Sequence, residues 1–103
     1  MNDVFLIGRV GESPKNIASE NGGMTVVFSL ATNESFTDKL GCKVEQTDWH
    51  NIVVFNPLAS VVLEKVVKGQ KLMIKGRLTY RKYVDSKGIE RQQAQILIKS
   101  LDF

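Results

Sequence analysis

The chain has 103 residues, 43% of them hydrophobic and 24% charged, with a net charge of +3 and one cysteine. This length fits a single domain, and no apolar run approaches the roughly 20 residues that a membrane-spanning helix needs. The lone Cys42 excludes an internal disulfide, has no companion thiols for a structural zinc site and fits a reducing compartment, and the N-terminus MNDVFLIGRV lacks the features of a secretory signal.

Alternation with a period of two predicts β-strands in the first half of the chain. A first strand is expected over 4–10, ending at the turn residues GESPKN, and NGG at 21–23 predicts a turn before a second strand over 24–33. The polar stretch 34–47 has the composition of a long loop or a mobile hairpin. A third strand is expected over 48–55.

A short helix is predicted over 58–69, directly after Asn56-Pro57, because its apolar residues recur at spacings of three and four. Gly69 stands where the C-terminus of a helix favours glycine, although the valines of this segment also suit a strand. A fourth strand over 70–84, a DSKG turn and a fifth strand over 90–101 complete the chain.

Five strands with one helix between the third and the fourth is the order of the OB-fold, a partly open Greek-key barrel. We therefore expect one all-β domain over 1–103 with a single short helix and no C-terminal tail. Such barrels leave a face of their second and third strands free for a ligand, which is a nucleic acid, a sugar or a protein in different members of the fold.

The third strand carries the only tryptophan of the chain. Alternation places Trp49, Asn51, Val53 and Phe55 on one face, and the first and last of these lie roughly 20 Å apart, which suits two contacts on an extended ligand. An asparagine on this face also argues against a core. The alternative is that the indole of Trp49 plugs the end of the barrel.

The fourth strand has a basic face. Half of the 14 Lys and Arg residues lie between Lys65 and Val84 without an acid among them. One parity of the strand is apolar and includes Leu72, Ile74, Gly76, Leu78 and Tyr80; the other includes Lys71, Met73, Lys75, Arg77, Thr79, Arg81 and Tyr83. A bulge at Gly76 would exchange the two tyrosines.

Cations interleaved with aromatic rings indicate a surface for single-stranded nucleic acid, because cations hold phosphates and rings stack on bases for roughly 1–3 kcal/mol per base. Duplex DNA hides the faces of its bases, so such a surface selects single strands. The alternative is a solvated strand that its lysines keep soluble.

Four segments resemble a known family: LIGRVGESP, FSLATNES, TDWHNIVVF and KGQKLMIKGRLTYRKYVDSKGIERQ are similar to the bacterial and mitochondrial single-stranded DNA-binding proteins, in that order and spacing. The resemblance implies an OB-fold that binds single-stranded DNA without sequence preference in replication, recombination and repair, and that assembles as a homotetramer. It implies stacking aromatics at Phe36, Trp49, Phe55 and Tyr83, phosphate contacts at Arg9, Lys43, Lys75, Arg77, Arg81, Lys82 and Arg91, and a subunit contact at His50.

The bacterial members often carry tryptophan where Phe36 and Tyr83 stand, and they usually carry an acidic recruiting tail. No such tail is expected here, so tail-dependent recruitment of replication and repair proteins is not assumed. A primosome-type OB adaptor, which would be a dimer, and a reader of structured RNA remain as alternatives. No enzyme, cofactor or metal is expected, because no nucleophile pair, metal-ligand spacing or phosphate loop is present. The expected setting is the bacterial cytoplasm or the mitochondrial matrix.

Overall fold

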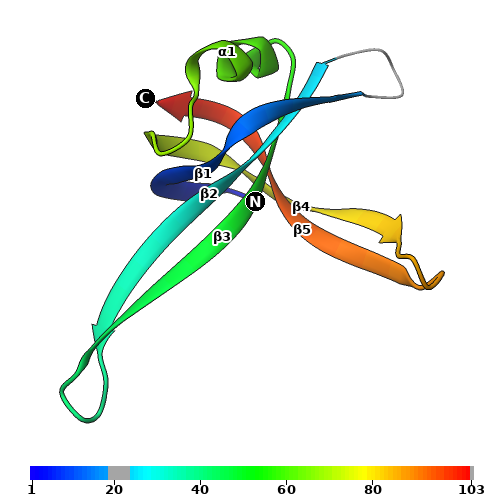
Figure 1. Ribbon diagram of the computed structural model, residues 1–103. Helices are drawn as coiled ribbons and strands as arrows, with labels where there is room; N and C mark the ends of the chain where they lie inside the picture. Colours follow the sequence, from blue (N-terminus) through cyan, green and yellow to red (C-terminus); the bar gives the residue numbers. More distant parts are fainter. Residues whose placement is uncertain (19–23, 103) are drawn as a thin grey trace.

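The computed structural model describes residues 1–18 and 24–102, so the turn predicted at 21–23 lies outside the described residues (Figure 1). Its strands close into a barrel in the order β1-β2-β3-β5-β4. The helix lies between the third and fourth strands, which confirms the predicted OB-fold order. The elements are β1 (Val4–Ala18), β2 (Met24–Thr37), β3 (Lys43–Phe55), α1 (Leu58–Lys65), β4 (Lys71–Val84) and β5 (Glu90–Asp102).

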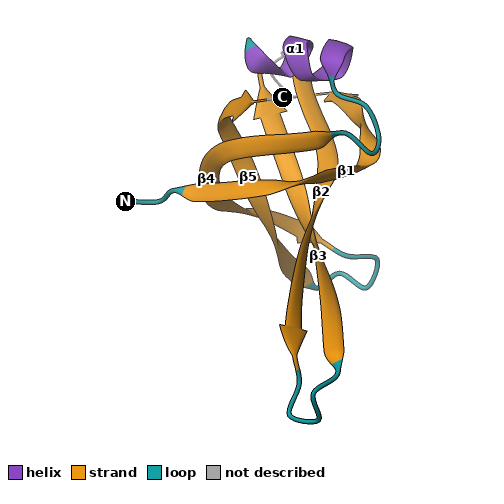
Figure 2. Ribbon diagram, turned by 90° about the vertical axis from the view of Figure 1, so that its left-hand side faces the viewer, coloured by secondary structure: helices purple, strands orange, loops and turns teal. Residues whose placement is uncertain are grey.

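The core fills the barrel with aliphatic side chains and the ring of Phe28, all from alternate strand positions. Each buried aliphatic side chain of this size stabilises the fold by about 1.5–3 kcal/mol. The helix α1 covers one end of the barrel with Ala59 and Val62, both fully buried (Figure 2). The strand members of the core are Val10, Val26, Phe28, Leu30, Ile52, Val54, Leu72, Ile74, Ile96 and Ile98.

The strand β1 is longer than predicted and runs through GESPKN to Ala18. Its pairing with β2 shifts register between Val10 and Glu12 and again between Glu12 and Lys15. Bulges at these places accommodate glycine and proline inside a strand. The prediction that the first strand ends at residue 10 is therefore wrong.

The helix α1 is shorter than predicted, because it ends at Lys65 and Val66 is already extended, with φ −93° and ψ 130°. Gly69 has φ +86° and lies in the turn that follows, where the backbone N–H of Gln70 donates to the carbonyl of Val67 at 3.2 Å. Glycine at residue 69 therefore serves the turn into β4 rather than the end of the helix.

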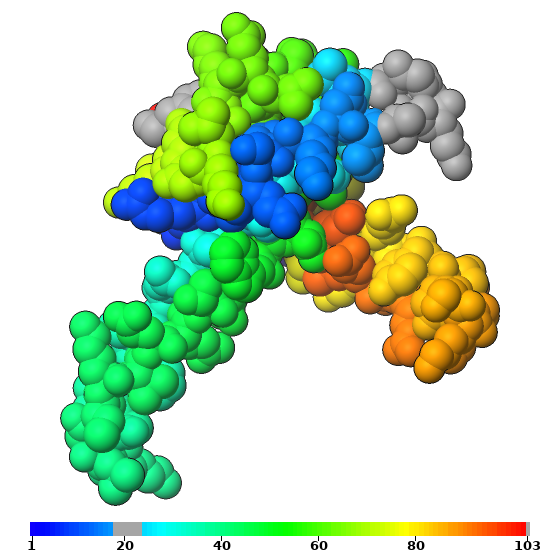
Figure 3. Space-filling model, viewed as in Figure 1, coloured from blue at the N-terminus to red at the C-terminus, as the bar shows by residue number. Residues whose placement is uncertain are grey.

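Two hairpins extend beyond the barrel as separate arms (Figures 1 and 3). The first arm, residues 33–47, continues the pairing of β2 with β3, and the second arm, residues 80–94, continues that of β4 with β5. Neither arm contains a buried residue. Of the two structures predicted for the polar stretch, the hairpin is confirmed.

Both arms end in the same five-residue turn, DKLGC at 38–42 and DSKGI at 85–89. In the first turn, Oδ1 of Asp38 accepts hydrogen bonds from the backbone N–H groups of Leu40 and Cys42, both at 2.9 Å. Gly41 has φ +81° there, and the equivalent Gly88 has φ +77°. Such conformations favour glycine, and an Asp side chain that bonds the following backbone fixes the turn.

Candidate nucleic-acid interface

The outer face of β3 displays two aromatic rings. Trp49 is 63% exposed and Phe55 is 52% exposed, whereas Ile52 and Val54 on the opposite face are fully buried. The predicted outward placement of Trp49 and Phe55 is therefore confirmed, although Val53 on the same face is only 7% exposed, and the alternative in which the tryptophan plugs the barrel is wrong.

Phe55 shares a hollow of about 270 Å³ with two arginines, Arg77 and Arg81. The hollow lies on the outer surface where β3, β5 and β4 run side by side, since Val53 of β3 is paired with Leu97 of β5, which in turn is paired with Arg77 of β4. An exposed ring beside two guanidinium groups offers a base a stacking partner and a phosphate a pair of cations. The lining is completed by Val53, Thr79, Tyr80, Gln95 and Leu97.

A second hollow, of about 260 Å³, adjoins the first one and shares Val53, Arg81 and Gln95 with it. It extends across β3 to Asn51 and across β2 to Ser29. The outer surface is therefore hollowed from β4 toward β2, with amide, hydroxyl and guanidinium groups and the carboxylate of Glu12 along it.

Trp49 does not line either of these hollows. Arg9 of β1 is paired with Ala31 of β2, and Ala31 is paired with Trp49, so the three residues form one row across the sheet. The Nη1 of Arg9 donates a hydrogen bond of 3.1 Å to the carbonyl of Gly69. Because neighbouring strands are about 4.8 Å apart, the Cα atoms of Arg9 and Trp49 are about 10 Å from each other.

The basic face of β4 is divided rather than continuous. Lys75 lies with its Nζ 5.3 Å from the ring centroid of Phe5 on β1, whereas Arg77 and Arg81 line the hollow beside Phe55. The division coincides with a register shift, because Lys75 is paired with Ser100 and the next residue is paired with Ile98. The extra residue belongs to β5, so the two parities of β4 are not exchanged.

Tyr80 differs from its prediction. Its parity assigns it to the apolar set, yet the side chain is 58% exposed, and the residue lines the hollow that Phe55 shares with the arginines. The reason is that β4 leaves the barrel at this residue, so the inward parity no longer meets a core. Sequence reasoning missed Tyr80 as a site residue. Its position in the sequence between Arg77 and Arg81 was the feature that could have indicated it.

The two arms carry the other two predicted stacking residues, Phe36 and Tyr83, on separate surfaces. Phe36 is 49% exposed and is paired with Val44, which alternation places on the face opposite to Trp49, whereas Lys43 shares the Trp49 face. Tyr83 is 42% exposed. A ligand that contacts all four predicted aromatics must follow a curved path over the barrel and along both arms.

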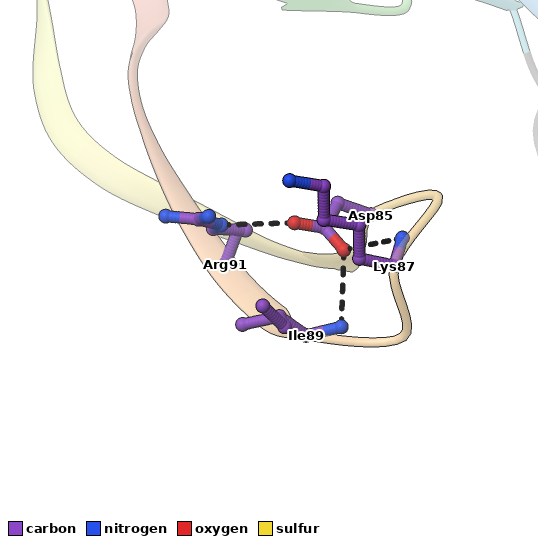
Figure 4. Close-up of polar contacts among 4 residues, drawn as sticks. All are labelled: Asp85, Lys87, Ile89 and Arg91. Carbon is purple, nitrogen blue, oxygen red and sulfur yellow. Dashed lines mark hydrogen bonds and ion pairs between the residues drawn. The ribbon is translucent and has the colours of Figure 1, made fainter.

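In the second arm, Tyr83 is paired with Arg91, so the two share one face, and Lys82 lies on the other. The charge of Arg91 is directed to Asp85, whose Oδ2 accepts a hydrogen bond of 3.0 Å from Nε (Figure 4). Hydrogen bonds from the backbone of Ile89 and from Arg91 hold the pKa of Asp85 below its ordinary value.

His50 lies half-buried on the face opposite to Trp49. Its Nε2 and Oγ1 of Thr32 form a hydrogen bond of 2.8 Å across β2 and β3. The structure thus places His50 on the face opposite to that of Arg9 and Lys43. Within residues 1–18 and 24–102, no group of three or more His, Cys, Asp or Glu could hold a metal ion, and no described helix is long and apolar enough to cross a membrane.

The model of the single-strand binding protein family matches residues 1–103. The chain belongs to this family. Among the family's relatives, the single-stranded DNA-binding proteins of Neisseria meningitidis serogroups A and B are each 38% identical to the chain over 101 residues. This match covers 98% of the chain but 58% of each relative, so the chain spans little more than half the length of these proteins.

Solved structures of the single-strand binding protein family share the fold. The Plasmodium falciparum SSB in complex with ssDNA superposes with a TM-score of 0.87 at 31% sequence identity, covering 99% of this chain and 91% of that one. A deletion mutant of the single-stranded DNA binding protein from Thermus aquaticus gives a TM-score of 0.83 at 27% identity, covering 99% and 49% of the respective chains. The family resemblance of the sequence is thereby confirmed.

Proposed function

We propose that this chain binds single-stranded DNA without sequence preference. The observation that carries the proposal is the exposed ring of Phe55 beside Arg77 and Arg81 in one hollow of the outer barrel surface. The Plasmodium falciparum relative, which has the same fold, is described in complex with ssDNA. The relatives named for single-stranded DNA binding do not favour the primosome-type adaptor.

Binding follows from two complementary contacts. Each exposed ring stacks on a base with a face that every base possesses, so the contact tolerates any sequence and contributes about 1–3 kcal/mol. Each cation that neutralises a phosphate releases condensed counterions, which makes the affinity fall with rising salt. Paired bases present no free face, and duplex DNA is therefore rejected.

The role we propose is to hold open and protect single strands during replication, recombination and repair, without turning over a substrate. An intracellular setting, the bacterial cytoplasm or the mitochondrial matrix, agrees with the single free Cys42. The DNA path runs along the outer face of β3 and then over both arms, because Trp49, Phe55, Phe36 and Tyr83 lie along these elements.

We propose that the protein acts as a homotetramer. Phe5, Ile7 and Met73 form an exposed apolar strip on β1 and β4 and are 67%, 58% and 48% exposed. An apolar strip of this kind favours burial against another protein surface. Sedimentation should give a mass of four chains, and a dimer would contradict this assembly.

Titration with oligo-dT tests DNA binding directly, because Trp49 is the only tryptophan and reports contact by fluorescence. We expect quenching at low salt, weaker binding as salt rises and no competition from a duplex of the same length. Absence of both quenching and retention on oligo-dT at low salt would refute the proposed function.

A further inference from the structure

Gly11 of β1 has no β-carbon, and the indole of Trp49 occupies the place where one would lie. A β-carbon added to Gly11 would overlap Cζ3 of Trp49 and lie 2.9 Å from Cε3 of the same ring, closer than real β-carbon contacts. The same β-carbon would lie 2.7 Å from Oγ of Ser29. The six-membered ring of the indole therefore rests against the backbone of Gly11.

This contact joins strands that are not neighbours. Trp49 on β3 is paired with Ala31 on β2, and the indole reaches across β2 to β1. Val10 and Glu12 are paired with Leu30 and Ser29, so Gly11 is the extra residue of a bulge in β1. The bulge presents a bare stretch of backbone at the point that the tryptophan reaches.

The backbone conformation itself does not require glycine at residue 11. Among the described glycines, φ is positive only at Gly41, Gly69 and Gly88. Alanine is therefore compatible with the local chain, and the demand for glycine comes from neighbouring side chains, chiefly the indole of Trp49 and also Oγ of Ser29.

Two other glycines of the barrel show the contrast. Added β-carbons at Gly8 and Gly76 would overlap the backbone carbonyl oxygens of Ala31 and Leu97, which cannot move without breaking the sheet. At Gly11 the obstacles are the ends of side chains, which can rotate away. An alanine at residue 11 should thus displace the tryptophan and leave the barrel intact.

We propose that Gly11 is a positioning residue that holds Trp49 against β1, with the rest of the ring open to a nucleobase. This inference rests on the proposed function. A ring that is already held loses less conformational freedom when a base stacks on it, and such preorganisation is worth about 2- to 10-fold in affinity.

The experiment compares Gly11→Ala, Trp49→Ala and the double variant, with Ser13→Ala as the control on the same strand. Oligo-dT affinity is measured for each, together with thermal unfolding. In the free proteins that retain Trp49, fluorescence anisotropy and acrylamide quenching report the motion and exposure of the indole.

We expect Gly11→Ala to unfold near the wild-type temperature, to lower the anisotropy of Trp49, to raise its quenching and to bind oligo-dT about 2- to 10-fold more weakly. Ser13→Ala should change none of these, and Gly11→Ala should have no further effect on affinity in the Trp49→Ala background. If Gly11→Ala does lower the unfolding temperature, Trp49→Ala should recover most of the loss, because the indole is then gone and only Oγ of Ser29 remains close.

The positioning role is overturned if the free Gly11→Ala protein keeps the wild-type anisotropy and affinity, if its affinity defect persists in the Trp49→Ala background, or if none of a lowered unfolding temperature is recovered there. Failure of the wild-type protein to bind oligo-dT would instead overturn the proposed function.

Discussion

Arg91 and Asp85 form an ion pair at the base of the second turn, with Nε of Arg91 3.0 Å from Oδ2 of Asp85. The other carboxylate oxygen accepts hydrogen bonds from the backbone N–H groups of Lys87, at 2.9 Å, and Ile89, at 3.0 Å. One side chain therefore closes the turn and also holds an arginine that belongs to the predicted phosphate contacts.

The first prediction concerns the titration of Asp85. Its pKa lies below the ordinary value of 3.8, chiefly because of the hydrogen bond from Ile89 and next because of Arg91. A lowered folded pKa means that the ionised carboxylate contributes stability at pH values above the unfolded pKa, and that this contribution is lost as the pH falls through the folded pKa.

Carboxyl NMR titration should therefore give Asp85 a midpoint below 3.8, and Arg91→Gln should move it only part of the way back, since the backbone hydrogen bond remains. A midpoint at or above 3.8 in the wild-type protein would contradict the turn geometry.

The second prediction compares two arginines. Arg81 lines the hollow beside Phe55 without an ion pair among the described residues, whereas Arg91 is held by Asp85. Loss of one phosphate contact reduces the slope of log affinity against log salt by about 0.7 for a single strand. Arg81→Ala should show this reduction and Arg91→Ala a smaller one.

Oligo-dT titrations at several salt concentrations measure these slopes. Lys65→Ala, which removes the same charge from α1 at the covered end of the barrel, serves as the control and should leave the slope unchanged. Equal slopes for the Arg81→Ala and wild-type proteins would remove Arg81 from the DNA path.

The third prediction concerns aromatic stacking. Phe55→Ala should weaken oligo-dT binding by about 1–3 kcal/mol, which corresponds to roughly 5- to 150-fold. Leu63→Ala is the control, because Leu63 is an exposed apolar residue on α1, at the covered end of the barrel and outside the proposed DNA path. A loss of affinity in Leu63→Ala that equals the loss in Phe55→Ala would show that the DNA path is wrongly placed.

The fourth prediction concerns amide exchange in the first arm. Residues 33–37 and 43–47 are paired in the absence of DNA, but none of them is buried. Segments without buried contacts open at lower free energy than a core does. Their amides should exchange faster than those of 26–30 and slow down when oligo-dT binds; exchange unaffected by oligo-dT would place the first arm outside the binding surface.

Alternation along the strands predicted the barrel well. The buried positions of β4 fall at Leu72, Ile74 and Gly76, as the apolar parity indicates. In β3 the core-facing Ile52 and Val54 are buried and Trp49 and Phe55 are exposed, but Val53 on the outer face is buried as well. Local pattern suffices here because one side of each strand meets the core and the other meets solvent.

Features that depend on distant strands were not predictable from the sequence. Tyr80 has the parity of a core residue but is exposed, because its burial depends on where the barrel ends and the second arm begins. The length of β1 was missed because glycine and proline signal a turn locally, while pairing with β2 absorbs both as bulges. The contact of Trp49 with Gly11 crosses β2 to join β3 with β1, and no spacing in the sequence encodes it.

The absence of core contacts in the arms has a consequence for how this fold diversifies. Adding or removing two residues on each strand of an arm keeps every side chain on its original face, since strand side chains alternate. The barrel would retain its packing while the reach over a bound polymer grew or shrank by about 7 Å per step. The length of single-stranded DNA that the protein covers and its thermal stability are thus free to evolve separately.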